Sequence, residues 1–205
     1  MLIHFKATLE DGTSRKIPVS LDQVSLDFSN ESIMAIDLSP LENITDLKEL
    51  DLSNNSLMSL DLAVLAFCKS LHSLKVNSNH LRVIDITPLK FCSMDLVDLS
   101  TNALIRIDLD PFAECQNLKT LDLHDNQLMA IELTPLSKCI RLEELNLIGN
   151  KFKRLDISPL FTCASLHSLM VSEETKLVSW KPPEIEILNP PAINALIEEG
   201  RIEFL

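Results

Sequence analysis

The sequence predicts an α/β solenoid, a stack of similar coils that each carry a short strand on one side and a short helical turn on the other. One observation is that asparagines recur in steps of 23 or 24 residues, at Asn55, Asn79, Asn102, Asn126 and Asn150. A second is that cysteines recur in the same steps, at Cys68, Cys92, Cys115, Cys139 and Cys163. A fixed period of this length indicates repeated units that bury their apolar faces against one another.

The residues around each asparagine follow the pattern LxxLxLxxNxL, which predicts the strands. The pattern occurs at 47–57, 71–81 and 118–128, at 142–152 with Phe in the last place, and at 94–104 with Met and Val substituted. Alternating leucines point to one side of a strand, so they would fill the inside of each coil. Degenerate copies at 24–33 and 166–175 carry Glu31 and Glu174 in place of asparagine. These copies are expected to be the end coils, because terminal repeats act as caps.

A nine-residue segment such as IDITPLKFC (84–92) predicts the helical turns. Ser, Thr or Asp followed by Pro is a typical helix start, in which the side-chain oxygen caps free N–H groups and proline fits the first turn. Ala63-Val64 has neither residue, and this turn is expected to be the weakest. The helix-start pairs are Ser39-Pro40, Thr87-Pro88, Asp110-Pro111, Thr134-Pro135 and Ser158-Pro159.

Together these motifs, LxxLxLxxNxLxxIDLSPLxxC, resemble the leucine-rich repeat family, of the intracellular type with 23–24-residue repeats, from residue 23 to about 172. The resemblance implies a right-handed, curved solenoid of about seven coils, with a concave parallel sheet and helical turns on the convex side. It also implies that each asparagine turns inward and bonds the backbone of neighbouring turns. The family's usual work is to bind a protein on the concave sheet.

The column of cysteines is interpreted as core, because cysteine is a small buried hydrophobe. Zinc needs four convergent ligands, whereas a column offers two neighbours at most. Helical turns about 10 Å wide would hold neighbouring Cα atoms beyond the roughly 7 Å that a disulfide permits. Extended segments would instead bring them to about 5 Å, and disulfides would then not be excluded.

A column of acids in the same nine-residue segments has two readings. Carboxylates near helical N-termini are stabilising, which is the favoured reading. The other reading is a ladder of divalent-cation sites, although no glycine-rich calcium repeat accompanies it. The column consists of Asp37, Asp61, Asp85, Asp108, Glu132 and Asp156.

The sequence divides into an N-terminal β-hairpin cap (1–22), the repeats (23–175) and a C-terminal cap with a short helix (176–205). Alternation on both sides of Asp11-Gly12 predicts the hairpin. In the C-terminal segment, Asn189 followed by two prolines predicts a helix start, and Gly200 its end. Trp180 is expected to anchor this cap. The alternative is a partner-binding tail.

Residues that alternate with the inward leucines are the candidate partner-binding residues, because they point to the concave face. The first column is largely acidic, and an apolar trio of Leu96, Ile148 and Met170 supplies candidate anchors. A separate column of Met34, Met58, Ile105 and Met129 is expected to be half-buried, with an adaptable docking strip as the alternative. The concave candidates are Asp27, Asp51, Lys75, Asp98, Asp122, Asn146 and Met170, with Asn77, His124, Ile148 and Leu96.

Composition and charge exclude several classes of function. The net charge of −12 argues against binding phosphate backbones or anionic membranes. The N-terminus does not resemble a signal peptide, there is no long apolar run, and five cysteines are an odd number that suits a reducing cytoplasm. No nucleotide-binding, hydrolase or zinc motif occurs, so neither catalysis, a cofactor nor a metal is expected.

The sequence therefore predicts a cytoplasmic, monomeric, non-catalytic scaffold that recognises a protein with a basic surface through a concave acidic sheet. The alternative is a stoichiometric regulator, an inhibitor or targeting subunit of an enzyme such as a phosphatase, a nuclease or a small GTPase. That alternative is implied by the resemblance to ribonuclease-inhibitor-like and phosphatase-regulatory repeat proteins.

Overall fold

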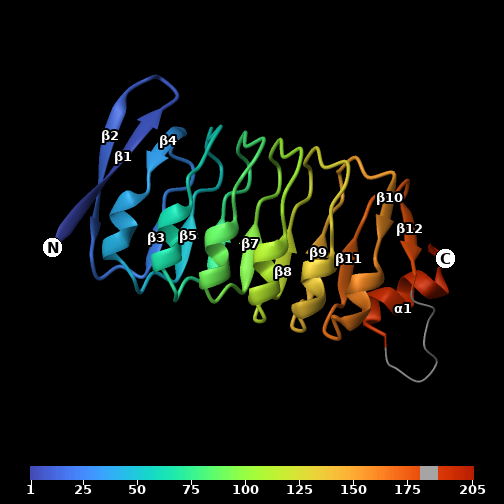
Figure 1. Cartoon of the computed structure of the whole chain (residues 1–205). Coiled ribbons are helices and arrows are strands. Elements are labelled where there is room, and N and C mark those ends of the chain that lie inside the picture. Colours follow the sequence, from blue (N-terminus) through green and yellow to red (C-terminus); the bar gives the residue numbers. More distant parts are fainter. Residues whose placement is uncertain (181–188) are drawn as a thin grey trace.

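The computed structural model describes residues 1–180 and 189–205. Its centre is a seven-stranded parallel sheet in the order β11-β9-β8-β7-β6-β5-β3 (Figure 1). Equivalent residues of successive coils pair in register, so that Asp98 lies between Lys75 and Asp122. The predicted leucine-rich repeat solenoid is confirmed. The strands are β3 Ser25–Asp27, β5 Glu49–Asp51, β6 Ser73–Lys75, β7 Leu96–Asp98, β8 Thr120–Asp122, β9 Glu144–Asn146 and β11 Ser168–Met170.

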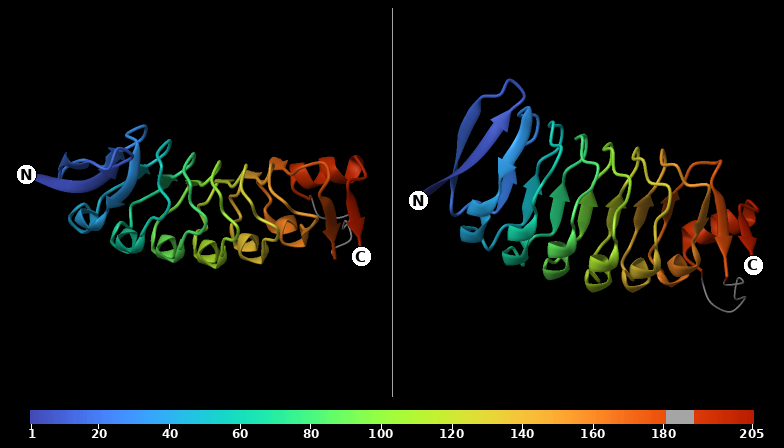
Figure 2. Two further views of the ribbon diagram at one scale, coloured as in Figure 1. Left: turned by 90° about the horizontal axis from the view of Figure 1, so that it is seen from above. Right: turned by 45° about the horizontal axis from the view of Figure 1, so that its top comes forward.

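The opposite, convex side is a row of short 3-10 turns (Figure 2). Each turn buries a Leu or Phe in the core at its third position, and two of the turns also bury their prolines, Pro111 and Pro135. The turn that begins with Ala63-Val64 has the same five-residue length as the others, although it lacks proline. The turns are η1 Ser39–Asn43, η2 Ala63–Phe67, η3 Thr87–Phe91, η4 Asp110–Glu114, η5 Thr134–Lys138 and η6 Ser158–Thr162.

The turns are not capped by their Ser and Thr hydroxyls, so that expectation was wrong. The N-cap residues are leucines or isoleucines, and none caps its turn with a side-chain hydrogen bond. Instead, the acid one residue before each N-cap accepts the first free N–H, as when Thr87 donates to Asp85 Oδ1 at 2.9 Å. A side chain two residues earlier reaches this N–H in a tight Asx-type turn, whereas the hydroxyl lies at the first residue of the turn itself.

Buried asparagines join the coils. Asn126 Nδ2 donates to the Leu99 carbonyl of the preceding coil at 3.0 Å and to the Leu123 carbonyl of its own coil at 3.1 Å. Its Oδ1 accepts the N–H of Leu104 at 2.9 Å. One side chain therefore satisfies backbone groups of two coils that would otherwise be buried without partners. Asn55, Asn79, Asn102 and Asn150 bond in the same way.

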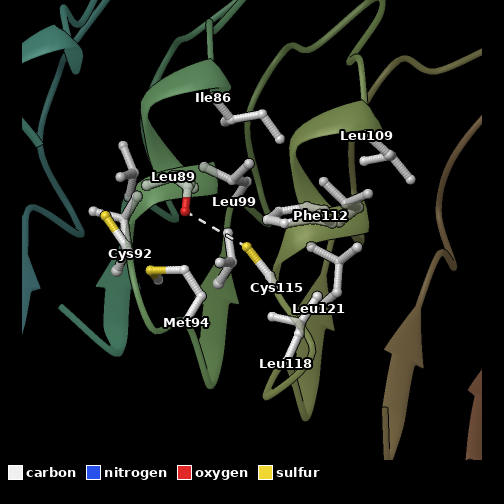
Figure 3. Close-up of a cluster of buried hydrophobic side chains, with 14 of the residues drawn as sticks. Ile86, Leu89, Cys92, Met94, Leu99, Leu109, Phe112, Cys115, Leu118 and Leu121 are labelled. Carbon is white, nitrogen blue, oxygen red and sulfur yellow. Dashed lines mark hydrogen bonds between the residues drawn. The ribbon is translucent and has the colours of Figure 1, made fainter. Parts of the chain in front are cut away.

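The cysteines form a second ladder, behind the 3-10 turns. All five are free and buried. The Cys115 thiol donates to the Leu89 carbonyl of the preceding turn at 3.5 Å (Figure 3), and Cys139 donates to Phe112 at 3.2 Å. The disulfide alternative does not apply, because all five thiols are free and each faces the carbonyl of the buried third residue of the preceding turn. Burial raises the pKa of Cys139 to about 12.

A hairpin covers the first coil. Strands β1 Leu2–Leu9 and β2 Ser14–Ser20 pair antiparallel, and β1 also pairs with β4 Ile33–Asp37. Phe5 is fully buried, and its ring centroid lies 5.1 Å from that of Phe28 in the first coil. Apolar surface at this end of the stack is thereby removed from water.

The last coil is covered by β12 Lys176–Ser179, β13 Ile202–Phe204 and the helix α1 Pro191–Glu198, and β12 pairs with β10 Arg154–Asp156 of the repeats. Ile193 of α1 and Leu177 of β12 are buried against the core at this end of the stack. Trp180 is 66% exposed, so the expectation that it anchors the cap was wrong. It lies one residue beyond the end of β12, where the chain leaves the sheet.

Replacing the core asparagine of one coil should weaken the whole stack. In Asn126→Ala, the buried Leu104 N–H and two carbonyls lose their partner, and the donor alone costs about 1–3 kcal/mol. Urea unfolding should show a loss of this size or larger. The neighbouring exposed Gln127→Ala is the control and should change the free energy of unfolding little. An equal effect of both variants would contradict this account of the ladder.

The thiols should be almost unreactive in the native state. A pKa of about 12 in place of 9.0 lowers the thiolate fraction of Cys139 at pH 8 about a thousandfold. Labelling with a disulfide reagent should therefore be slow in buffer and fast in urea. In the unfolded chain the thiols ionise at a lower pH than in the folded protein. The free energy of unfolding should therefore fall as pH rises above 9.0. Rapid labelling of the native protein would contradict the buried ladder.

Candidate protein-binding surface

The parallel register brings the first predicted column together on the concave face. Asp51, Lys75, Asp98, Asp122 and Asn146 occupy equivalent positions on five neighbouring strands and are all partly exposed. Lys75 Nζ lies 3.7 Å from Asp51 Oδ2, and Asn146 Nδ2 donates to Asp122 Oδ2 at 3.3 Å. Asp27 continues the column on β3. The result is a row of carboxylates with one cation near its N-terminal end.

These aspartates also have a structural role that the sequence analysis missed. One carboxylate oxygen of each accepts the backbone N–H two residues further on, as in Ser100 N to Asp98 Oδ1 at 3.0 Å. Asp27, Asp51 and Asp122 make the same bond. The bond fixes the turn that ends each strand. The spacing Asp-x-Ser, at 27–29, 51–53 and 98–100, carried this signal in the sequence.

The second column is less accessible than the first. Ser53 and Ser100 are buried, whereas Asn77 and His124 are half-exposed. His124 Nδ1 lies 2.7 Å from Asp122 Oδ1, and its other ring nitrogen lies 3.4 Å from the Thr101 hydroxyl. His124 is therefore held in place in the middle of the concave face, beside the acids.

The apolar trio does not form one patch. Ile148 and Met170 are exposed and lie together, whereas half-buried Leu96 belongs to β7, which β8 separates from β9. Ile148 and Met170 line a cleft of about 440 Å³ whose other wall is α1, through Ala195 and Leu196. The sequence indicated the apolar face of this helix but not that the helix lies beside the concave sheet.

Arg201 adds a cation to this cleft. Its Nη2 is buried and has no hydrogen-bond partner among residues 1–180 and 189–205. Glu173 and Glu199 also line the cleft. A buried guanidinium nitrogen without a partner is costly to folding. The cleft thus combines an apolar wall with charged side chains of both signs.

The carboxylates of the acid column on the convex side are engaged by their own turns. Each carboxylate accepts the N–H at the start of its turn, at 2.8–3.0 Å. The Thr134 hydroxyl and then its N–H lower the pKa of Glu132, and the Thr87 side chain and then its N–H lower that of Asp85. Within the described part of the chain, no group of three or more His, Cys, Asp or Glu residues is placed to hold a metal ion.

Comparison with known proteins identifies the family. A profile described as "Leucine rich repeat" matches residues 92–152, and one described as "BspA type Leucine rich repeat region (6 copies)" matches residues 19–103. The chain belongs to the leucine-rich repeat family, whose domains are typically binding scaffolds and not enzymes. A search of curated proteins finds no significant match.

Several solved structures share the fold. Internalin C2 from Listeria monocytogenes is 25% identical, with a TM-score of 0.59 over 82% of this chain and 66% of that one. The Arabidopsis receptor kinase HAESA, solved with the peptide hormone IDA and the co-receptor SERK1, is 28% identical, with a TM-score of 0.66 over 78% of this chain. The ectodomain of GASSHO1/SCHENGEN3 from Arabidopsis thaliana, solved with CASPARIAN STRIP INTEGRITY FACTOR 2, is 25% identical, with a TM-score of 0.53 over 70% of this chain.

This chain is shorter than these relatives. It spans 66% of the internalin C2 chain, 27% of the HAESA chain and 20% of the GASSHO1/SCHENGEN3 chain. In the part of the chain that the structure describes, no helix has the length and apolarity needed to cross a bilayer.

Two substitutions of Asp85 separate the role of its hydrogen-bond acceptor from the role of its charge. Asp85→Asn keeps an oxygen that accepts the Thr87 N–H, whereas Asp85→Ala removes it. The alanine variant should unfold at lower urea than the asparagine variant, which should stay close to wild type. Calorimetry with millimolar calcium should show no heat of binding for any of the three. Calcium binding that is lost in Asp85→Asn would instead support the cation ladder.

Proposed function

We propose that this chain is a non-catalytic scaffold that holds a protein partner against its concave face. The observation that carries the proposal is the row of partly exposed carboxylates on neighbouring strands, continuous with the cleft beside α1. The row supplies charge, and the cleft supplies an apolar pocket. Protein interfaces commonly combine a charged region with a desolvated anchor in this way.

The charge of the concave row selects a basic partner. Asp51, Asp98 and Asp122 stand on a chain whose net charge is −12, so the local and the overall field have the same sign. Such a field raises the rate of encounter with a positive surface, and salt screens it. His124 and Leu96 lie beside the row and would make central contacts.

The cleft beside α1 fits an apolar side chain of the partner. Ile148, Met170 and Leu196 would contact that side chain. The charged side chains of Glu173, Glu199 and Arg201 line the same cleft. Burying such an anchor contributes more to affinity than the exposed ion pairs do.

The relatives support this class of function. The HAESA structure contains a peptide hormone and a co-receptor, so a leucine-rich repeat domain of the same fold binds polypeptides. We place the chain in a reducing compartment such as the cytoplasm, as a monomer, because its five cysteines are free and buried and both ends of the stack are covered.

Removing charge from the concave row should weaken partner binding. The triple variant Asp51→Asn, Asp98→Asn and Asp122→Asn keeps the oxygens that accept the backbone N–H groups, so the fold should survive. Affinity for a partner captured from lysate of the source cell should fall about tenfold, and its dependence on salt should become shallower.

The matched control changes the same charge on the convex side, as Asp85→Asn, Asp108→Asn and Asp156→Asn. It should bind like wild type, because it alters the overall charge but not the concave row. Equal affinity of the two triple variants would contradict the proposal. If the partner is an enzyme, its activity at saturating scaffold separates a stoichiometric regulator from a passive tether.

A further inference from the structure

One edge of the solenoid differs in charge from the rest of the chain. It consists of the six five-residue segments that follow the core asparagine position of each coil, and we call it the basic edge. The chain contains 30 acidic residues in 205, so an even spread would put about four in these segments, yet they contain none. The next residue in every coil is an acid. The segments are 32–36, 56–60, 80–84, 103–107, 127–131 and 151–155.

Apolar side chains project from this edge into solvent. Met58 is 66% exposed and Met129 is 69% exposed, and Met34, Val83 and Ile105 are also exposed. The expectation that the methionine column is half-buried is therefore wrong for Met58 and Met129, whereas Met34 and Ile105, at 38% and 47% exposed, are close to half-buried. The residue before each methionine, such as Leu57 or Leu128, fills the core, and this turns the methionine outward.

The edge also carries exposed cations. Arg82, Arg106, Lys151, Lys153 and Arg154 are exposed. None forms an ion pair or a side-chain hydrogen bond with another residue in 1–180 or 189–205. Arginine presents a planar fork that matches a carboxylate in two hydrogen bonds. These groups are available to a partner.

The loops of the basic edge are held in place by backbone hydrogen bonds. Its segments lie in a row between β4 and β10 along the upper border of the molecule in Figure 1. Neighbouring coils are joined there by backbone bonds, from Ile105 N to Arg82 O at 3.1 Å and from Lys151 N to Leu128 O at 2.8 Å. A partner would thus bind to positioned loops and would not have to order them.

We propose that the basic edge binds an acidic, amphipathic segment of a second protein, laid across the coils. Its apolar side chains would contact Met58, Ile105 and Met129, whose flexible or branched side chains adapt to irregular surfaces. Its carboxylates would pair with Arg82 and Arg106. Coils spaced by about 4.8 Å give the six segments a span of about 24 Å, which suits about seven extended residues.

This site is distinct from the concave face and does not depend on the function proposed for it. The two surfaces have opposite charge preferences, so one protein could carry a basic partner and an acidic one together. A flat anionic membrane is disfavoured as the occupant, because it would face the acid column that flanks every segment, whereas a narrow peptide segment can lie along the edge alone.

The test is selection of displayed random dodecapeptides on the intact wild-type chain, followed by fluorescence anisotropy of the enriched peptides. We expect peptides rich in Asp, Glu and large apolar residues. The charge-reversed variant Arg82→Glu with Arg106→Glu should lose at least about tenfold in affinity, and Met58→Ser with Met129→Ser should lose affinity as well.

Two controls locate the binding site. Lys69→Glu with Lys138→Glu makes the same change of charge at exposed positions on the convex side and should bind like wild type. The concave triple variant should also bind like wild type, which separates this proposal from the concave one. Circular dichroism of each variant checks that it is folded.

Several results would overturn the proposal. They are failure to enrich acidic amphipathic peptides, equal binding by the charge-reversed variant, and loss of binding in the concave variant. Vesicles of phosphatidylserine that bind wild type but not the charge-reversed variant would assign the edge to a membrane surface. Dimerisation lost in that variant, measured by sedimentation, would assign it to a second copy of the chain.

Discussion

The whole molecule depends on one repeated interaction, the hydrogen bonds of a buried asparagine to the backbone of two coils. A coil that turns through a strand, a loop and a 3-10 turn leaves backbone groups inside that no regular ladder can satisfy. Asn126 satisfies groups of Leu99, Leu104 and Leu123 at once. Because the same bonds recur at the same place in five successive coils, the strands stack without slipping. Equivalent surface residues of successive coils therefore lie side by side in columns.

Much of the acidity of the chain follows from the same need to satisfy backbone groups. Four aspartates end strands on the concave side, and six acids begin turns on the convex side, each by accepting an N–H two residues away. Charge on both faces is thus partly a consequence of how a coil is built. The absence of acids from the basic edge stands out against this background, because no such bond is made there.

The sequence predicted the solenoid, the inward asparagines and the cysteine column, because a period repeated along the chain is a strong signal. It could not predict which oxygen caps a turn, since hydroxyl and carboxylate stand two residues apart and both are good acceptors. It could not orient Met58, which lies in the connection between β5 and η2, or Trp180, which directly follows β12. Nor could it place α1 beside β11, because that packing depends on contacts between distant segments.

Methionine oxidation footprinting of the scaffold with its captured basic partner tests the central claim most directly. Met170 lies in the concave cleft, Met58 and Met129 lie on the basic edge, and buried Met94 is an internal reference. The account predicts that the partner slows oxidation of Met170 to the sulfoxide and leaves Met58 and Met129 unchanged. Protection of Met58 and Met129 with Met170 still reactive would contradict binding on the concave face.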